Sequence, residues 1–129
     1  MNIKRISFDF DGTLSKQEVY AVALMLLEDN YTLYIITKRF DYPQKHQKAA
    51  NEDVKEVARK LRIPKDHLIF TNGLSKSKFI KKHEIILHLD NNLNEISDID
   101  ENANCELVYV GLGSSWLRNL FKKLIRYQL

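Results

Sequence analysis

The stretch ISFDFDGTLS, from Ile6 to Ser15, carries an apolar run into two aspartates that are separated by a single residue. The apolar part, from Lys4 to Phe8, predicts a β-strand, and Asp9 and Asp11 follow at its carboxyl end. Two carboxylates held close together at the tip of a buried strand repel each other unless something compensates their charge. This stretch therefore predicts the first strand of a sheet and, at its end, a functional site.

The rest of the chain alternates strand-like and helix-like segments. Further strands are predicted over Tyr31–Thr37, His67–Thr71, Ile85–Leu89 and Glu106–Gly111. Apolar residues at helical spacing predict helices over 15–29, 50–61 and 116–125, a short lysine-rich helix after Ser75, and a loop with one helical turn over 91–104. Ser15 and Glu18 are expected to form a capping box, and Ser75 to cap the short helix. In the last helix, Trp116 and Phe121 are expected on the core-facing stripe.

Five strands that alternate with helices call for a parallel sheet with helices on both faces. The predicted fold class is therefore α/β, a three-layer sandwich around a five-stranded parallel Rossmann-like sheet. The length of 129 residues suits one domain, and no linker or internal repeat divides it. Residues 1–129 are expected to form a single domain.

Composition narrows the classes of function. The net charge of +3 is too small to indicate nucleic-acid binding by itself, and the lysines are spread along the helices as on a solvated surface. The single cysteine, Cys105, excludes an intrachain disulfide and a zinc site built from several cysteines. Since we find no signal peptide and no apolar run of about 20 residues, the expectation is a cytoplasmic protein without a membrane partner.

Polar side chains follow the predicted strands at the points where the strands end. In parallel sheets of this class the ligand crevice lies beyond those carboxyl ends. The residues there are Asp9 and Asp11, Thr37, Thr71 to Gly73, and Asp90 to Asn92, with Lys76 and Lys78 opening the short helix. Carboxylates suit Mg²⁺, and one carboxylate can attack phosphorus while a lysine and a threonine hold the phosphoryl oxygens. This set of groups predicts a site for phosphoryl transfer.

The segment FDFDGTL resembles the first motif of the haloacid dehalogenase-like superfamily, D-x-D-G-T, at the end of a first strand. Thr37 is similar to the Ser/Thr of the second motif. Lys76 or Lys78 is similar to the lysine of the third motif, and Asp90 to the acidic residue of the fourth. The four motifs occur in order over nearly the whole chain. Because dehalogenases and ATPases carry other residues at the position of Asp11, the resemblance implies a phosphatase-type member.

The resemblance also implies a role for each residue. Asp9 is expected to be the nucleophile and a ligand of Mg²⁺, and Asp11 the general acid/base and a ligand through its backbone carbonyl. Thr37 and the lysine are expected to bind the phosphoryl group, and Asp90 to complete the metal site. The strand order usual in the family places the first strand between the fourth and the second, which brings Asp9, Asp90 and Thr37 together.

Two features depart from the usual pattern. Asp90 is followed by Asn91 and Asn92, where many relatives have a second acidic residue, so the site carries less charge with which to hold Mg²⁺. The lysine of the third motif is ambiguous. Lys76 lies closer to the helix start and to the active edge of the sheet, which favours it, and Lys78 is the alternative.

The short gaps between the motifs leave no room for a cap domain. By resemblance, capless members act on large or exposed phosphates or borrow a neighbouring subunit. The loop KRFDYPQKH is the candidate substrate loop, in which Lys38, Arg39 and His46 are expected to meet phosphate. Phe40 and Tyr42 are expected to stack on a base. Alternatively, the two rings pack against the start of the next helix and the cations of the loop are solvated. A nucleotide or a nucleic-acid end is therefore the first candidate for the phosphorylated substrate, and a small sugar or metabolite phosphate the second.

The sequence thus predicts a Mg²⁺-dependent phosphomonoesterase that works through an aspartyl-phosphate. The alternative from another class is a catalytically weak member that binds a phosphorylated partner, which the asparagines after Asp90 favour and the presence of both Asp9 and Asp11 opposes. A receiver-like signalling domain is set aside because the third predicted strand ends without an aspartate. His88, inside the fourth strand, is expected to support the core or the site rather than bind a ligand. The oligomeric state is not predicted.

Overall fold

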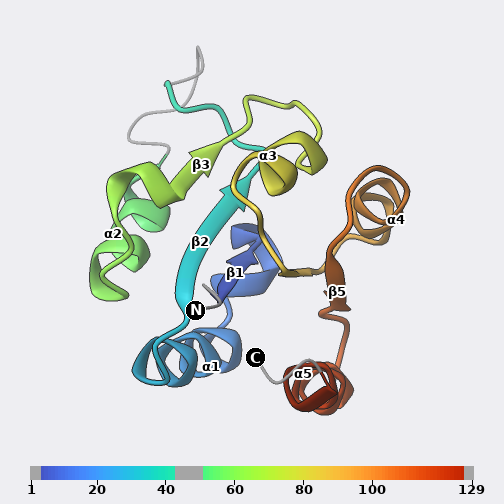
Figure 1. The fold of residues 1–129 in the computed structure, drawn as a ribbon. Coiled ribbons are helices and arrows are strands. Elements are labelled where there is room, and N and C mark those ends of the chain that lie inside the picture. The colour runs from blue at the N-terminus through green and yellow to red at the C-terminus, as the bar shows by residue number, and fades with distance from the viewer. Residues whose placement is uncertain (1–3, 43–50, 127–129) are drawn as a thin grey trace.

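The computed structural model describes residues 4–42 and 51–126 and shows one sheet with helices on both faces (Figure 1). The sheet has five parallel strands in the order β3-β2-β1-β4-β5. The strands are β1 Arg5–Phe8, β2 Thr32–Thr37, β3 Leu68–Phe70, β4 Leu87–Asp90 and β5 Glu106–Tyr109. The helices are α1 Gln17–Glu28, α2 Glu52–Lys60, α3 Ser77–Lys82, α4 Leu93–Asn102 and α5 Ser115–Arg126, with short helical turns η1 Phe10–Leu14 and η2 Lys65–His67. The predicted three-layer α/β fold with five parallel strands is confirmed.

Two apolar cores lie on opposite faces of the sheet. Helices α1, α2 and α5 pack on one face, against strand residues that include Phe8 and Leu89. Helices α3 and α4 cover the other face, where Ile80 and Ile99 pack with Ile36. Figure 1 shows this division, with α1 and α5 together on one side and α3 and α4 on the other. Because both faces are covered, the central strands are nearly continuous apolar runs.

Strand β1 occupies the centre of the sheet, between β2 and β4. The chain passes from β1 to β2 and β3 on one side, then crosses back over β1 to reach β4 and β5. The direction of the strand order therefore reverses beside β1, and the crevice at such a switch point is where sheets of this kind bind ligands. The order expected from the family resemblance is confirmed, and it places Asp9 between the ends of β2 and β4.

The segment predicted as a loop with a single helical turn is instead the ten-residue helix α4. Its N-cap is Asn92, whose side chain accepts hydrogen bonds from the backbone N–H groups of Asn94 and Glu95. Ile99 is fully buried on the face that meets the sheet. The prediction was wrong because the many polar residues of this segment concealed the asparagine cap and the short apolar stripe.

The capping box predicted for Ser15 and Glu18 does not form. Helix α1 begins at Gln17, and no side chain caps its first turn. The Ser15 hydroxyl instead accepts a hydrogen bond of 3.0 Å from the N–H of Gly12, within the extra turn η1 that separates β1 from α1. The Ser15 hydroxyl is therefore already hydrogen-bonded within η1 and does not cap α1.

Two other helix predictions need adjustment. Helix α3 begins at Ser77, one position later than a cap at Ser75 implies, although the Ser75 hydroxyl does accept the Ser77 N–H at 3.2 Å. In α5, Trp116 and Leu120 are buried, whereas Phe121 is 37% exposed. Since Phe121 follows Leu120 directly, it lies about 100° further round the helix and leaves the buried face.

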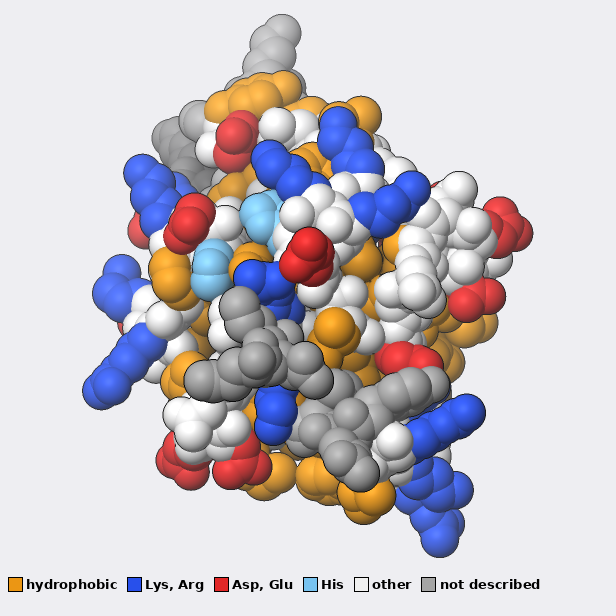
Figure 2. All heavy atoms as spheres, viewed as in Figure 1, with side chains coloured by type: hydrophobic (Ala, Val, Ile, Leu, Met, Phe, Trp, Pro, Cys, Tyr) orange, Lys and Arg blue, Asp and Glu red, His pale blue; other side chains and the backbone are white. Residues whose placement is uncertain are grey.

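Charged side chains of both signs are exposed at the surface. On the face drawn in Figure 2, Lys and Arg side chains are dispersed among Asp and Glu side chains rather than gathered in one basic patch. This distribution agrees with the small net charge of +3. Among the described residues, no helix is long and apolar enough to cross a membrane.

Candidate active site

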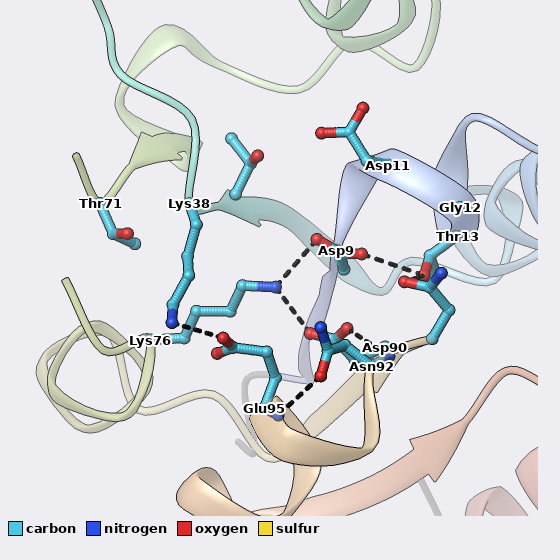
Figure 3. Close-up of polar contacts among 12 residues, drawn as sticks. Asp9, Asp11, Gly12, Thr13, Lys38, Thr71, Lys76, Asp90, Asn92 and Glu95 are labelled. Atoms are coloured by element: carbon cyan, nitrogen blue, oxygen red, sulfur yellow. Dashed lines mark hydrogen bonds and ion pairs between the residues drawn. The ribbon is translucent and has the colours of Figure 1, made fainter. Parts of the chain in front are cut away.

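An open cavity of about 280 Å³ lies at the carboxyl edge of the sheet. It gathers the ends of β1, β2 and β4 and the starts of α3 and α4, and its lining residues are Asp9, Asp11, Thr37, Lys38, Arg39, Lys76, Asp90, Asn91, Asn92 and Glu95. Every one of them is polar or charged. Figure 3 shows the side chains of Lys76, Asp9 and Asp90 turned toward one another. The cavity therefore brings together the residues that the sequence predicted for catalysis, phosphate binding and metal binding.

Lys76 lies between two carboxylates. Its Nζ is 2.9 Å from Asp9 Oδ1 and 2.6 Å from Asp90 Oδ2. The three residues are only 2%, 8% and 0% exposed, in the order Lys76, Asp9, Asp90. Buried charges require partners of opposite sign, and these three residues supply them to one another. Lys78, the alternative lysine, is exposed, and its Nζ lies 5.2 Å from the centre of the Phe79 ring.

Burial and mutual attraction set the protonation of this cluster. Burial raises the pKa of Asp9 to about 6, although the charge of Lys76 acts in the opposite direction. Burial also opposes the charge of Asp90, but the hydrogen bond from His88 and the charge of Lys76 outweigh it and lower the pKa of Asp90 to about 2. For Lys76, burial is outweighed by the attraction of both aspartates, which raises its pKa. At neutral pH all three groups are charged.

The turn after β1 brings the backbone close to the site. The N–H of Asp9 donates to the backbone oxygen of Leu89 at 2.9 Å, which extends the pairing of β1 with β4. Gly12 has φ of +73°, and a Cβ at this position would overlap the Asn91 amide, so two constraints favour glycine here. Thr13 then donates its hydroxyl to Asp9 Oδ2 at 3.3 Å. The glycine and the threonine of FDFDGTL thus shape the surroundings of Asp9.

The amide of Asn91 meets two acceptors at the end of β1. In the orientation that satisfies both acceptors, the amide nitrogen of Asn91 lies 2.9 Å from Asp9 Oδ2 and 3.0 Å from the backbone oxygen of Asp11. With the amide nitrogen turned to them, Asn91 donates to both. The side chain of Asn91 thus bridges the carboxylate of Asp9 and the backbone of Asp11.

The set of metal-binding side chains is small. Within residues 4–42 and 51–126, no three His, Cys, Asp or Glu side chains come together as ligands of one metal ion. Mg²⁺ suits such a site better than other cations do, because it keeps several waters and binds through one or two carboxylates. The carboxylates of Asp9 and Asp90 and the backbone oxygen of Asp11 fit that requirement.

Glu95 is a site residue that the sequence analysis missed. It is 9% exposed and lines the cavity. Its Oε1 lies 2.5 Å from Lys38 Nζ, while its buried Oε2 has no hydrogen-bond partner among the described residues. Glu95 lies in the first turn of α4, so only recognition of Asn92 as a helix cap would have directed its side chain to the site. It supplies an acidic group that the asparagines next to Asp90 lack.

A second ion cluster lies at the mouth of the cavity. Arg39 donates to both carboxylate oxygens of Asp11, at 2.9 and 2.7 Å, and to both of Asp53, at 2.7 and 2.9 Å. The hydrogen bonds to Asp53 and Asp11 raise the pKa of Arg39, and Arg39 lowers the pKa of Asp53. The Asp11 and Asp53 side chains are 60% and 58% exposed, so water screens their charges. The sequence did not predict the participation of Asp53.

The candidate substrate loop begins inside the site. Thr37 is 1% exposed, and its hydroxyl accepts the N–H of Arg39 at 3.3 Å. Phe40 and Tyr42 form an edge-to-face pair with ring centres 5.5 Å apart, and they are 37% and 54% exposed. Both rings therefore remain accessible to a ligand. His46, also predicted to meet phosphate, lies outside the described residues.

Two further residues from the sequence analysis lie away from the cavity surface. His88 is fully buried and bonds to Asp90 at 2.9 Å, a position that supports the site from behind. Burial raises the pKa of Cys105 to about 12, which keeps the thiol protonated and unsuited to nucleophilic attack.

No protein-family model and no curated protein matches the chain.

Proposed function

We propose that this protein is a Mg²⁺-dependent phosphomonoesterase that works through an aspartyl-phosphate at Asp9, as a capless member of the haloacid dehalogenase-like superfamily. The observation that carries the proposal is the buried cluster of Asp9, Lys76 and Asp90, which shares a wholly polar cavity with Thr37. Phosphoryl transfer requires a nucleophile, positive charge and hydrogen-bond donors around one phosphorus atom, and this cavity offers each of them. The resemblance of the four motifs supports the same assignment.

Each aspartate of the first motif has one role in the proposed reaction. In the first step, an ionised oxygen of Asp9 attacks phosphorus, the bond from phosphorus to the leaving oxygen breaks, and Asp11 gives its proton to that oxygen. In the second step, Asp11 takes a proton from water, the water oxygen attacks phosphorus, and the bond to Asp9 breaks. Inorganic phosphate leaves, and both carboxyl groups return to their starting states. Lys76 and Thr37 hold the phosphoryl oxygens, where negative charge accumulates.

Mg²⁺ would be held by the Asp9 and Asp90 carboxylates and the backbone oxygen of Asp11. When bound, it supplies positive charge that neutralises phosphoryl oxygens and orients the phosphate toward the nucleophile. Asp90 is prepared for this role because its low pKa keeps it ionised. Arg39 anchors the side chain of Asp11 at the mouth of the cavity, and Figure 3 shows that the Asp11 side chain, unlike that of Asp9, is not turned toward Lys76.

A nucleotide or nucleic-acid end is the substrate class that the surroundings of the cavity favour. The polar lining offers no apolar wall for the organic part of a small substrate. Outside it, exposed large hydrophobic side chains follow the carboxyl ends of four strands: Phe40, Tyr42, Leu74, Leu93 and Leu112. Aromatic side chains next to cations bind bases by stacking, so Phe40 and Tyr42 beside Arg39 suit a substrate whose phosphate enters while its base stays outside.

Hydrolysis of para-nitrophenyl phosphate tests the proposed function. Wild-type protein should release nitrophenol with Mg²⁺ and not with a chelator, and Asp9→Asn should lower turnover by roughly three orders of magnitude or more. Asp66→Asn, at an exposed position of η2, is the matched control and should retain full activity. Acid quenching followed by mass spectrometry should locate phosphate on Asp9. Full activity of a folded Asp9→Asn protein would exclude the proposed nucleophile.

The substrate class is tested with the same protein. Phosphorylated oligonucleotides and nucleoside monophosphates should be hydrolysed with a higher kcat/KM than sugar phosphates. Tyr42→Ala should lower kcat/KM for the oligonucleotides alone, and Met25→Ala, which alters an exposed side chain on α1, should change neither. A higher kcat/KM for sugar phosphates would overturn the nucleic-acid assignment while leaving the phosphatase chemistry intact.

A phosphate-binding module with little catalysis is the second candidate. The small set of acidic ligands in the described residues favours it, because weak metal binding would leave phosphate bound and unreacted. Calorimetry with inorganic phosphate distinguishes the two. Phosphate binding by a well-folded protein that hydrolyses none of the substrates at millimolar Mg²⁺ would favour the binding module.

A further inference from the structure

Ser7 and His88 form a polar pair inside the sheet. They are direct partners in the register of β1 with β4, and both are fully buried. Their neighbours along the strands are apolar: Ile6 and Phe8 on β1, Leu87 and Leu89 on β4. The Ser7 hydroxyl lies 2.7 Å from His88 Nδ1, and His88 Nε2 lies 2.9 Å from Asp90 Oδ2. A chain of hydrogen bonds thus runs from the interior of the sheet to the floor of the cavity.

The chemistry of the partners fixes the direction of each bond. Ionised Asp90 only accepts hydrogen bonds, so His88 must donate from Nε2. His88 is fully buried, and the uncharged ring is the form that burial favours. A neutral imidazole carries one proton, and with that proton on Nε2 its Nδ1 accepts. The Ser7 hydroxyl must then be the donor, and the chain runs from Ser7 through His88 to Asp90.

These bonds leave the Asp90 carboxylate little freedom to rotate. Its Oδ2 receives His88 from the interior and Lys76 from the cavity side, at 2.9 and 2.6 Å. Its Oδ1 receives the N–H of Asn92 at 3.1 Å. Three donors from three directions therefore determine the plane of a carboxylate that lines the cavity. Of the three donors, His88 is the one whose residue does not line the cavity.

We propose that His88, oriented by Ser7, is a positioning residue that holds Asp90 in the orientation in which it binds Mg²⁺. This inference rests on the metal site of the proposed function. Groups that orient a metal ligand change metal affinity by about 10- to 100-fold when they are removed. Two fully buried polar residues of the central strands, Ser7 and His88, thus serve one carboxylate. Apolar residues would fill these two positions if only core packing were needed.

The test is metal binding, measured without substrate by calorimetry with Mg²⁺ and by electron paramagnetic resonance with Mn²⁺. His88→Met removes the donor at similar volume and should weaken binding by about 10- to 100-fold. His88→Gln, whose amide nitrogen can donate in place of Nε2, should restore part of the loss. His83→Met is the matched control, because His83 lies beside Tyr34 and away from the cavity, and it should leave binding unchanged.

Two further measurements keep the inference testable if His88→Met does not fold. Ser7→Ala should weaken binding a few-fold, and nitrogen NMR of the metal-free wild-type protein should show the proton of His88 on Nε2. A proton on Nδ1, or equal Mg²⁺ affinity in folded His88→Met and wild type, overturns the inference. Suppose that the wild-type protein hydrolyses no phosphate ester but binds Mg²⁺ more tightly than His88→Met does. This result would contradict the proposed function and support the role of His88. A wild-type protein that binds no Mg²⁺ overturns both.

Discussion

Two ion clusters, each of one cation and two aspartates, lie at Asp9 and Asp11 of FDFDGTL. In each, one cation joins two carboxylates: Lys76 joins Asp9 to Asp90, and Arg39 joins Asp11 to Asp53. The first cluster is almost fully buried, whereas the carboxylates of the second are more than half exposed. In the buried cluster each charge depends on the others, because water cannot replace a lost partner. In the exposed cluster water can do so, and the contacts can break and form again at little cost in free energy.

This difference matches the roles that we propose for Asp9 and Asp11. The nucleophile and the metal ligand need fixed positions, and Lys76 fixes both. The general acid/base has to meet a leaving group and then a water, so an exposed carboxylate anchored by a screened contact suits it. Burial, rather than residue type, thus distinguishes the two aspartates.

Removal of the buried cation, Lys76, should have the largest effect on the free energy of unfolding. Lys76→Met leaves the charges of Asp9 and Asp90 facing each other in the interior, and it should lower the free energy of unfolding by about 3–5 kcal/mol. Urea denaturation at neutral pH measures this loss. Lys78→Met, two positions away on the exposed side of α3, should lower it by less than about 0.5 kcal/mol. Similar losses in both variants would contradict the difference between a buried and an exposed lysine.

In the metal-free protein, the protonation of Asp9 should change the free energy of unfolding by about 1 kcal/mol. The pKa of Asp9 is about 6 in the folded protein and 3.8 in its unperturbed state. The folded state therefore holds this proton at higher pH than the unfolded state does, so the contribution of Asp9 to stability is lost as the pH rises through 6. Asp9→Asn stays neutral, and its stability relative to wild type should be greater by about 1 kcal/mol at pH 7.5 than at pH 5.

Chemical denaturation in the presence of a chelator at the two pH values measures this change. The comparison with Asp9→Asn cancels the titration of the other groups. A relative stability that is the same at both pH values would show that Asp9 titrates in its ordinary range.

The exposed cluster should give the smallest effect and the only one that depends on salt. Arg39→Gln breaks the contacts to Asp11 and Asp53, and it should lower the free energy of unfolding by at most about 1 kcal/mol at low ionic strength. In 1 M NaCl, where the Debye length is about 3 Å, the loss should nearly vanish. The loss caused by Lys76→Met should stay almost the same under both conditions. Equal salt dependence in the two variants would contradict the difference in burial.

The sequence predicted the buried cluster better than the exposed one. Asp9 and Asp90 lie at strand ends, and parallel strands bring their carboxyl ends to one edge, so the fold class implies that these two residues meet. Lys76 was preferred over Lys78 because it lies closer to the start of the short helix and to that edge. The contact between Arg39 and Asp53 depends on how the loop after β2 reaches α2. No periodic pattern encodes that path, so the sequence predicted Arg39 on phosphate and did not identify Asp53.

Helix α4 shows the same limit for the fold. Its boundaries depend on a single capping side chain, Asn92, and on one buried isoleucine, Ile99, in an otherwise polar segment. Because that helix was predicted as a loop, its first-turn residue Glu95 was absent from the predicted site. The strands were easier to predict, since strands covered on both faces are nearly continuous apolar runs.

The position of β4 beside β1 also determines when the site comes into existence as the chain folds. Ser7 and His88 are strand partners although 81 positions separate them in the chain. Strand β1 can pair with β2 across the single helix α1, whereas closure of the much longer loop to β4 is slower. A growing or truncated chain that ends before β4 would already carry Asp9, the proposed nucleophile, but it would lack Asp90 and the cluster in which Lys76 joins the two aspartates. The order of the strands thus delays assembly of the proposed site until β4 has paired with β1.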